Sequence, residues 1–152
     1  MSDADLGAIA AYLKSLPAPR VAQTASHAPA NGTTAKLTAA QNLTLVERLY
    51  LDNCNACHFA NGKGASRVFP HLDGATTVNA ASPTALIHII LAGARTPSTA
   101  KAPSVLPMPG FANRLTDDEV AQLATFLRSG WSNHTGPVDT AQVARVRQTL
   151  SK

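Results

Sequence analysis

The sequence predicts an all-α protein, because large apolar side chains recur at helical spacing in five segments that capping residues, glycine or proline delimit. The composition fits a small helical domain. Of the 152 residues 45% are hydrophobic, but 28 of these are alanine and only 38 are Leu, Ile, Val, Met, Phe, Tyr or Trp. A core of that size is thin for this chain length, so another group is expected to supply apolar bulk.

Composition and charge argue against several classes of protein. No uncharged apolar run approaches the ~20 residues of a membrane span, so a transmembrane topology is excluded. Two cysteines are too few for a disulfide scaffold. The net charge of +4 is spread along the chain without a dense basic stripe, so no nucleic-acid partner is expected.

Residues 1–16 are expected to form a short amphipathic helix. Ser2 and Asp5 have the spacing of a capping box, and apolar residues follow at helical intervals until Pro17. Residues 17–36 consist mainly of small and polar residues, with almost no large apolar side chain. This composition predicts a flexible linker.

Two helices are expected in the first part of the domain that we assign to residues 37–136. One is predicted to run from Thr38 towards Cys54 and the other from Ser82 to Gly93, where Ser-Pro starts the helix and glycine ends it. A stretch punctuated by glycine and proline lies between them.

A long loop is expected at residues 95–110, which contain four prolines and no helical period. Loops of this length inside a compact domain tend to carry function. Thr116 and Glu119 form a second capping box, which predicts a fourth helix ending at Gly130. Residues 137–152 are expected to add a helical extension. It is either an amphipathic helix that contacts a partner or membrane surface or a plain surface helix, which is preferred.

The first helix is repeated near the end of the chain, where residues 2–15 align with residues 116–129 at a shift of 114. The aromatic residue, the basic residue and the closing serine all match, with Tyr12 over Phe126. A duplicated element explains this match better than the general likeness of capped helices. The opening helix is therefore interpreted as the last helix of a preceding domain.

Cys54-x-x-Cys57-His58 is the strongest chemical signal in the chain. Two intervening residues space the thiols for thioether bonds to the vinyl groups of one haem, and the next histidine is placed to ligate its iron. A thioredoxin-like pair would need a βαβ pattern, and in a zinc site His71 and His88 would fit no common ligand spacing. Two buried structural cysteines are the third alternative. The motif predicts one covalently attached haem c.

Met108 is predicted to be the second axial ligand of the iron. The other methionine, Met1, lies beyond the linker, whereas prolines stiffen the loop around Met108 and reduce the entropy lost on ligation. His71 is the main competitor, although its nearness in sequence to His58 makes coordination from the opposite face awkward. His27, His88 and His134 are weaker candidates.

The order of these features resembles a class I cytochrome c domain: helix, Cys-x-x-Cys-His, Pro-x-Leu, helix, Met-Pro loop, helix. Residues 37–150 look most like the third haem domain of the three-haem cytochrome c subunit of periplasmic alcohol, aldehyde and gluconate dehydrogenases. The segments that carry this likeness are 69–72, 91–96, 108–111, 115–121, 127–133 and 143–147. The resemblance implies a cytochrome c-like helical fold around one haem.

The resemblance also implies a role for each site residue. Cys54 and Cys57 would attach the haem, with His58 as the proximal ligand and Met108 as the distal ligand. Because both axial positions are then filled, the chain is expected to transfer electrons by an outer-sphere route and not to be an enzyme.

Residues outside the haem motif are implied as well. The Pro70 carbonyl would accept a hydrogen bond from the proximal histidine, and Arg95 would contact a haem propionate. Tyr50 and Phe126 would meet where the first and last core helices cross.

Two positions depart from the family pattern. Val46 and Phe59 stand where the family commonly has glycine. Val46 puts a very close crossing of the first and last core helices in doubt.

The expected role is to pass electrons from a periplasmic dehydrogenase to the respiratory chain. The catalytic subunit of that dehydrogenase and a quinone or another cytochrome are the expected partners. A stand-alone monohaem cytochrome c is the alternative, and a peroxidase-type haem enzyme would require an iron without Met108. Between Asn53 and Arg114 the chain has five basic residues and one acidic residue, Asp73. These basic residues either steer an acidic partner or are scattered charge: Lys63, Arg67, Arg95, Lys101 and Arg114.

The compartment follows from the chemistry of haem attachment, which implies export to the periplasm. Asp3 and Asp5 follow Met1 almost at once, so no signal peptide is recognised at the start of the sequence. The chain is therefore interpreted as a fragment of a longer exported protein.

Overall fold

The computed structural model describes residues 2–16, 32–66, 68–95 and 106–150. These residues form seven α-helices and no β-strand, which confirms the predicted all-α class. Two isolated antiparallel bridges are the only strand-like pairings within the described ranges. No helix in these ranges is long and apolar enough to cross a membrane.

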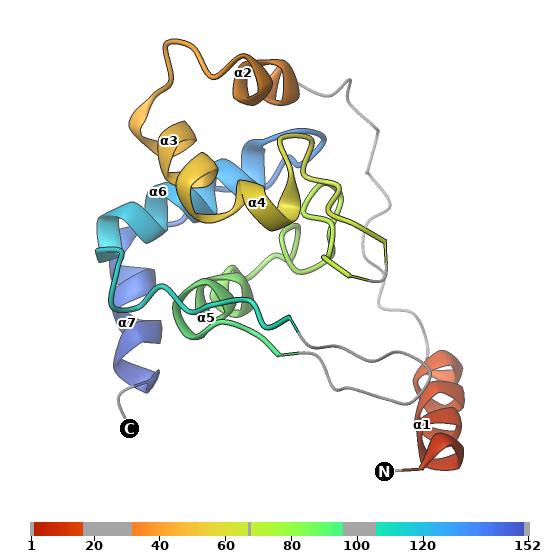
Figure 1. Ribbon diagram of the computed structural model, residues 1–152. Helices are drawn as coiled ribbons and strands as arrows, with labels where there is room; N and C mark the ends of the chain where they lie inside the picture. The colour runs from red at the N-terminus through yellow and green to blue at the C-terminus, as the bar shows by residue number, and fades with distance from the viewer. Residues whose placement is uncertain (1, 17–31, 67, 96–105, 151–152) are drawn as a thin grey trace.

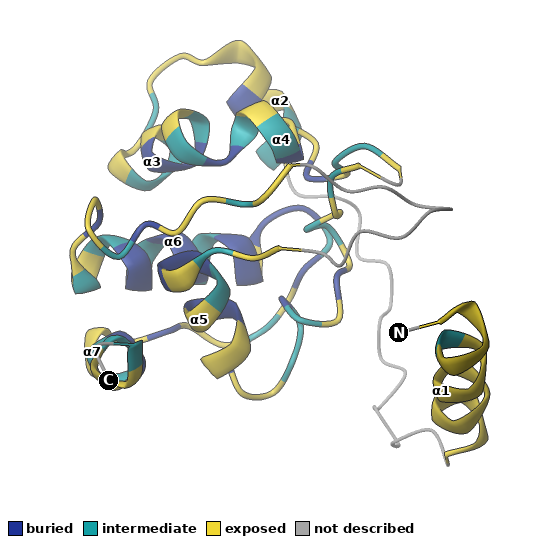
Figure 2. Cartoon of the chain, turned by 60° about the horizontal axis from the view of Figure 1, so that its bottom comes forward, coloured by how far each residue is buried: buried dark blue, intermediate teal, exposed yellow. Residues whose placement is uncertain are grey.

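Helix α1 (Asp3–Ser15) has the predicted capping box, in which Ser2 and Asp5 exchange hydrogen bonds. None of its residues is buried, and Tyr12 and Leu13 are 65% and 60% exposed. Figure 1 shows α1 apart from the other helices, and Figure 2 shows its surface to be almost entirely exposed. Its apolar side chains therefore lack a core to pack into.

The single helix predicted from Thr38 towards Cys54 is wrong, because the structure has two helices there, α2 (Thr33–Ala39) and α3 (Leu45–Asn53). Ala40 ends α2 in the left-handed conformation, with a φ of 51°. This residue turns the chain, so the apolar side chains on either side of it do not belong to one helical face.

A capping box explains where α3 begins. Thr44 and Glu47 exchange side-chain and backbone hydrogen bonds at its first turn. Helix α2 also starts inside residues 17–36, which were predicted as linker, and its Leu37 is buried. Residues 17–31 of that predicted linker lie outside the described part of the chain.

The three later predicted helices are confirmed as α5 (Thr84–Ala92), α6 (Asp117–Ser129) and α7 (Thr140–Leu150). Gly93 ends α5, and Thr116 caps α6 with the predicted box. Helix α7 buries two valines and is packed against both α5 and α6.

Helix α6 lies at the centre of the core, in contact with α3, α5 and α7 (Figures 1 and 2). Tyr50, Phe126 and Trp131 form an aromatic cluster at the crossing of α3 and α6, with ring centroids 5.4–5.9 Å apart. The predicted meeting of Tyr50 and Phe126 is confirmed, with their ring centroids 5.6 Å apart. The buried side chains of α6 are Val120, Ala121, Leu123, Ala124, Leu127 and Arg128.

Candidate haem site

The two cysteines lie on one short helical turn. Cys54 ends α3 and begins α4 (Asn55–His58), and its carbonyl accepts hydrogen bonds from the amides of Cys57 and His58. Residues three apart in such a turn point to the same side. Both thiols are free, Cys54 buried and Cys57 half-buried. Burial and the nearby Cys57 raise the pKa of the Cys54 thiol to about 12.

His58 closes α4 and is buried. Its Nδ1 donates a hydrogen bond to the Pro70 carbonyl oxygen at 2.8 Å, which is the contact that the family resemblance implies. This bond orients the ring and leaves Nε2 as the nitrogen that can bind a metal. Burial lowers the pKa of His58, and the bond to Pro70 opposes that shift in part. The result favours the neutral imidazole that a metal requires.

Close backbone packing places the Pro70 carbonyl beside His58. Gly64 donates its amide hydrogen to the His58 carbonyl and adopts a φ of +57°. A Cβ at Gly64 would lie 2.3 Å from the Phe69 carbonyl oxygen and 2.5 Å from that of Pro70. Any side chain here would push the Pro70 segment away, so this glycine is needed for the loop to reach the histidine.

The two carbonyls that follow His58 are held by the aromatic cluster. The Tyr50 hydroxyl donates to the Phe59 carbonyl at 2.7 Å, and Trp131 Nε1 donates to the Ala60 carbonyl at 3.0 Å. Burial raises the pKa of Tyr50 well above its usual range, so its hydroxyl stays protonated as the donor. The Tyr50 and Trp131 side chains thereby fix the exit of the chain from the haem motif.

Phe59 adopts a φ of 58° and a ψ of 163°, in a region that favours glycine. A bulky residue in this region costs on the order of 1–3 kcal/mol. The structure thus gives a physical reason why glycine would suit this position, and shows that phenylalanine is held there by the hydrogen bonds on both sides of its peptide.

Asn133 was not singled out for any role from the sequence, although it is fully buried. Its Oδ1 accepts from the Gly74 amide and from Asn79 Nδ2, while its Nδ2 donates to the Leu72 and Leu127 carbonyls. This one side chain therefore joins the end of α6 to the loop that follows Pro70.

Two further polar contacts were missed in the sequence. Ser132 donates from both its amide and its hydroxyl to Asp73, next to the Asn133 contacts. Arg128, which is buried, donates to the carbonyls of Val78, Ala80 and Gly136. The contacts of Ser132 with Asp73 and of Arg128 with Val78 and Ala80 join residues far apart in the chain, so local patterns did not reveal them.

Met108 is partly buried against the hydrophobic core and is held by the end of α5. Its amide and carbonyl pair with those of Ala94, at 2.9 and 3.1 Å. A Cβ at Gly93 would lie 2.4 Å from the Met108 carbonyl oxygen, and one at Gly110 would lie 2.6 Å from that of Leu91. Glycine at both positions allows the two segments to touch.

The rival ligands are dispersed. His71, His88 and His134 are exposed, while His27 and Met1 lie outside the described residues. The described ranges contain no group of three or more His, Cys, Asp or Glu side chains that could hold a metal ion. The structure thus offers no support for the zinc alternative.

The predicted basic group is only partly described. Lys63, Arg95 and Arg114 are exposed, whereas Arg67 and Lys101 lie outside the described residues. The Arg114 guanidinium lies 5.7 Å from the centroid of the Phe111 ring. Arg95 follows directly after Ala94, the partner of Met108 in the backbone bridge.

The donor set fits a haem c. Two thiols and a histidine oriented through Nδ1 lie on one helical turn, and the Met108 thioether lies on a separate loop tied to the end of α5. Cys54 and Cys57 could hold a haem through thioether bonds, and His58 and Met108 could ligate its iron; such a group would supply single-electron transfer.

Comparison with known proteins also indicates a cytochrome c domain. The cytochrome c family pattern matches residues 43–131. The chain is 39% identical over 150 residues to the cytochrome c subunit of a quinone alcohol dehydrogenase from Gluconobacter oxydans. The matched region covers 97% of this chain and 31% of that protein.

Two other relatives are subunits of different dehydrogenases. The chain is 35% identical over 153 residues to the cytochrome c subunit of gluconate 2-dehydrogenase from Pantoea cypripedii, covering 97% of this chain and 34% of that protein. It is 32% identical over 165 residues to the cytochrome subunit of a fructose dehydrogenase from Gluconobacter japonicus, covering 97% and 33%. The chain spans about a third of the length of these relatives.

Proposed function

The chain belongs to the cytochrome c family, and from this premise we propose that it carries one haem c and transfers electrons without catalysing a reaction of its own. Cys54 and Cys57 attach the haem, and His58 and Met108 ligate its iron. The observation that carries the proposal is the buried His58, which lies on the same helical turn as two free thiols. Its Nδ1 donates a hydrogen bond to the Pro70 carbonyl. Arg95 is assigned to a haem propionate.

The proposed setting is the cytochrome subunit of a periplasmic dehydrogenase complex. Relatives that span this chain are subunits of alcohol, gluconate and fructose dehydrogenases, which supports the dehydrogenase as electron donor. A quinone or another cytochrome accepts the electrons, as the quinone in the name of the alcohol dehydrogenase relative suggests. Ligation by methionine and histidine raises the reduction potential of a haem, which suits uptake of electrons from a dehydrogenase.

The spectrum of the haem-loaded chain tests this function. We expect the α-band of a low-spin, thioether-linked haem after reduction, and a Met–iron charge-transfer band after oxidation. One haem per chain should remain bound after acid–acetone extraction, because thioether bonds are covalent. Haem lost on extraction, or a high-spin iron that binds peroxide, would contradict the proposal and favour a haem enzyme.

Helix α1 is proposed to close a second cytochrome c domain. At the shift of 114 residues, Ile9, Tyr12 and Leu13 of α1 take the places of Leu123, Phe126 and Leu127. Leu123 and Leu127 are buried in the core, whereas Ile9 and Leu13 are 47% and 60% exposed. The same face is thus buried in α6 and exposed in α1. This difference supports the packing of α1 against the core of another domain.

Leu13→Ala tests this proposal in the complete gene product. It is expected to destabilise a haem domain other than that of Cys54 by about 3 kcal/mol, the cost of removing a buried leucine side chain. Denaturant unfolding followed at the haem bands measures the effect. In the 152-residue chain the same substitution should leave stability unchanged, because Leu13 is exposed there. A complete gene product with a single haem would favour the stand-alone cytochrome.

A further inference from the structure

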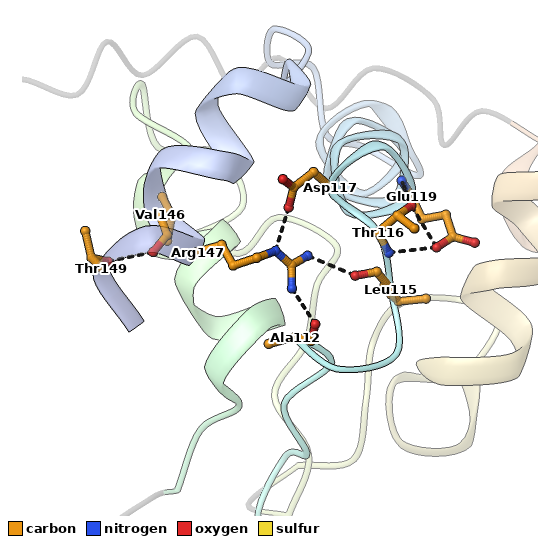
Figure 3. A network of polar contacts seen from close by, with 8 residues as sticks. All are labelled: Ala112, Leu115, Thr116, Asp117, Glu119, Val146, Arg147 and Thr149. Carbon is orange, nitrogen blue, oxygen red and sulfur yellow. Dashed lines mark hydrogen bonds and ion pairs between the residues drawn. The ribbon is translucent and has the colours of Figure 1, made fainter. Parts of the chain in front are cut away.

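The Arg147 side chain of α7 contacts the segment that follows Met108 in the chain (Figure 3). Its guanidinium donates to the Ala112 carbonyl, to the Leu115 carbonyl at 2.9 Å, and to the Asp117 carboxylate at 2.6 Å. Ala112 and Leu115 lie on the short stretch that joins Met108 to α6, and Asp117 is the first residue of α6. A planar guanidinium with donors in fixed directions suits three acceptors at once.

The same stretch is tied to α5 on its other side. The amide of Phe111 donates to the Ile90 carbonyl at 2.9 Å, and that of Ala112 donates to the Leu91 carbonyl at 3.1 Å. Ala112 is therefore held through its amide by α5 and through its carbonyl by Arg147. Since Ala112 lies four residues after Met108, its position limits how far the Met108 backbone can move.

Arg147 is only partly exposed and has little freedom to leave. The side chains of Arg147 and Asp117 are 28% and 29% exposed, and Val143 and Val146 of the same helix are buried. Asp117 is the first residue of α6, so the ion pair also joins the first turn of α6 to α7. The contact is built into the packing of two helices.

We infer that Arg147 is a positioning residue that keeps Met108 on the iron, by restraining the 108–117 segment from α7. The inference rests on the proposed function, since it needs Met108 as a ligand. The thioether–iron bond is weak, so how often it opens depends on the freedom of the backbone that carries it. Helix α7 is then part of the distal side of the haem site.

Imidazole competition on the oxidised, haem-loaded chain tests this role. Imidazole takes the iron position of Met108 with no change in oxidation state, so its affinity reports how readily the thioether leaves. Arg147→Gln is expected to raise the imidazole affinity about tenfold, which is the lower end of the effect of losing one charge-assisted hydrogen bond. Arg145→Gln is the matched control, because Arg145 is exposed on the same helix, and should change the affinity less than twofold.

Two further measurements separate this role from a general loss of stability. Amide hydrogen exchange at Phe111 and Ala112 should speed up in Arg147→Gln, while exchange within α3 should not. Asp117→Asn keeps the two bonds to carbonyls and should give an intermediate imidazole affinity, which serves as the test if Arg147→Gln does not fold. An unchanged imidazole affinity in a folded variant would overturn the inference. Absence of the Met–iron band in the parent chain would instead overturn the proposed function.

Discussion

Met108→Ala is expected to abolish the Met–iron charge-transfer band of the oxidised protein while the haem stays covalently bound. The thioether is the proposed distal donor, and alanine has no atom to replace it. Axial ligation moves haem potentials over a range of about 0.8 V, so we expect the reduction potential to fall by on the order of 0.1–0.3 V. Absorbance of the oxidised protein and redox titration measure both effects.

The control for this variant is Leu106→Ala, two residues earlier. Leu106 is exposed, so its removal should keep the band and shift the potential by little. Reduced spectra of both variants should keep the thioether-linked α-band, since Cys54 and Cys57 are untouched. A band that survives in Met108→Ala would remove Met108 from the iron and reopen the choice of distal ligand.

Much of the fold could be predicted from local signals in the sequence. Ser2 with Asp5, and Thr116 with Glu119, are capping boxes in the structure, because each satisfies the free amides of a first turn within four residues. The Thr44 and Glu47 pair is the same signal, yet the prediction ran one helix through it. Apolar residues continued on both sides of the break, and nothing in that pattern marks the left-handed Ala40.

The haem motif was readable for the same reason, since Cys54, Cys57 and His58 are close in sequence and their spacing is set by the haem. The contacts that support this motif and the Met108 segment, by contrast, join residues far apart in the chain. Asn133 meets Gly74, and Arg147 meets Ala112, across long stretches of chain. Such pairs depend on how helices pack, so a single sequence holds no local pattern that reveals them.

Asn133→Ala is expected to lower the free energy of unfolding of the haem-loaded chain by about 4 kcal/mol. The fully buried amide serves four partners, and its loss leaves the Leu72 and Leu127 carbonyls, the Gly74 amide and the Asn79 side chain without it. A buried polar group left unpaired costs about 1–3 kcal/mol, and water entering the space would recover part of the sum. Denaturant unfolding followed by tryptophan fluorescence measures the change.

Asn113→Ala is the matched control, because Asn113 is exposed and should change stability by less than about 0.5 kcal/mol. The location of the damage also distinguishes the role of Asn133. The loop it holds begins at Leu72, two residues after the carbonyl that accepts from His58. Amide exchange at Leu72 and Gly74 should therefore rise more than exchange at Phe111, which α5 holds independently. Equal rises at both places would mean that Asn133 stabilises the whole core and not the proximal loop.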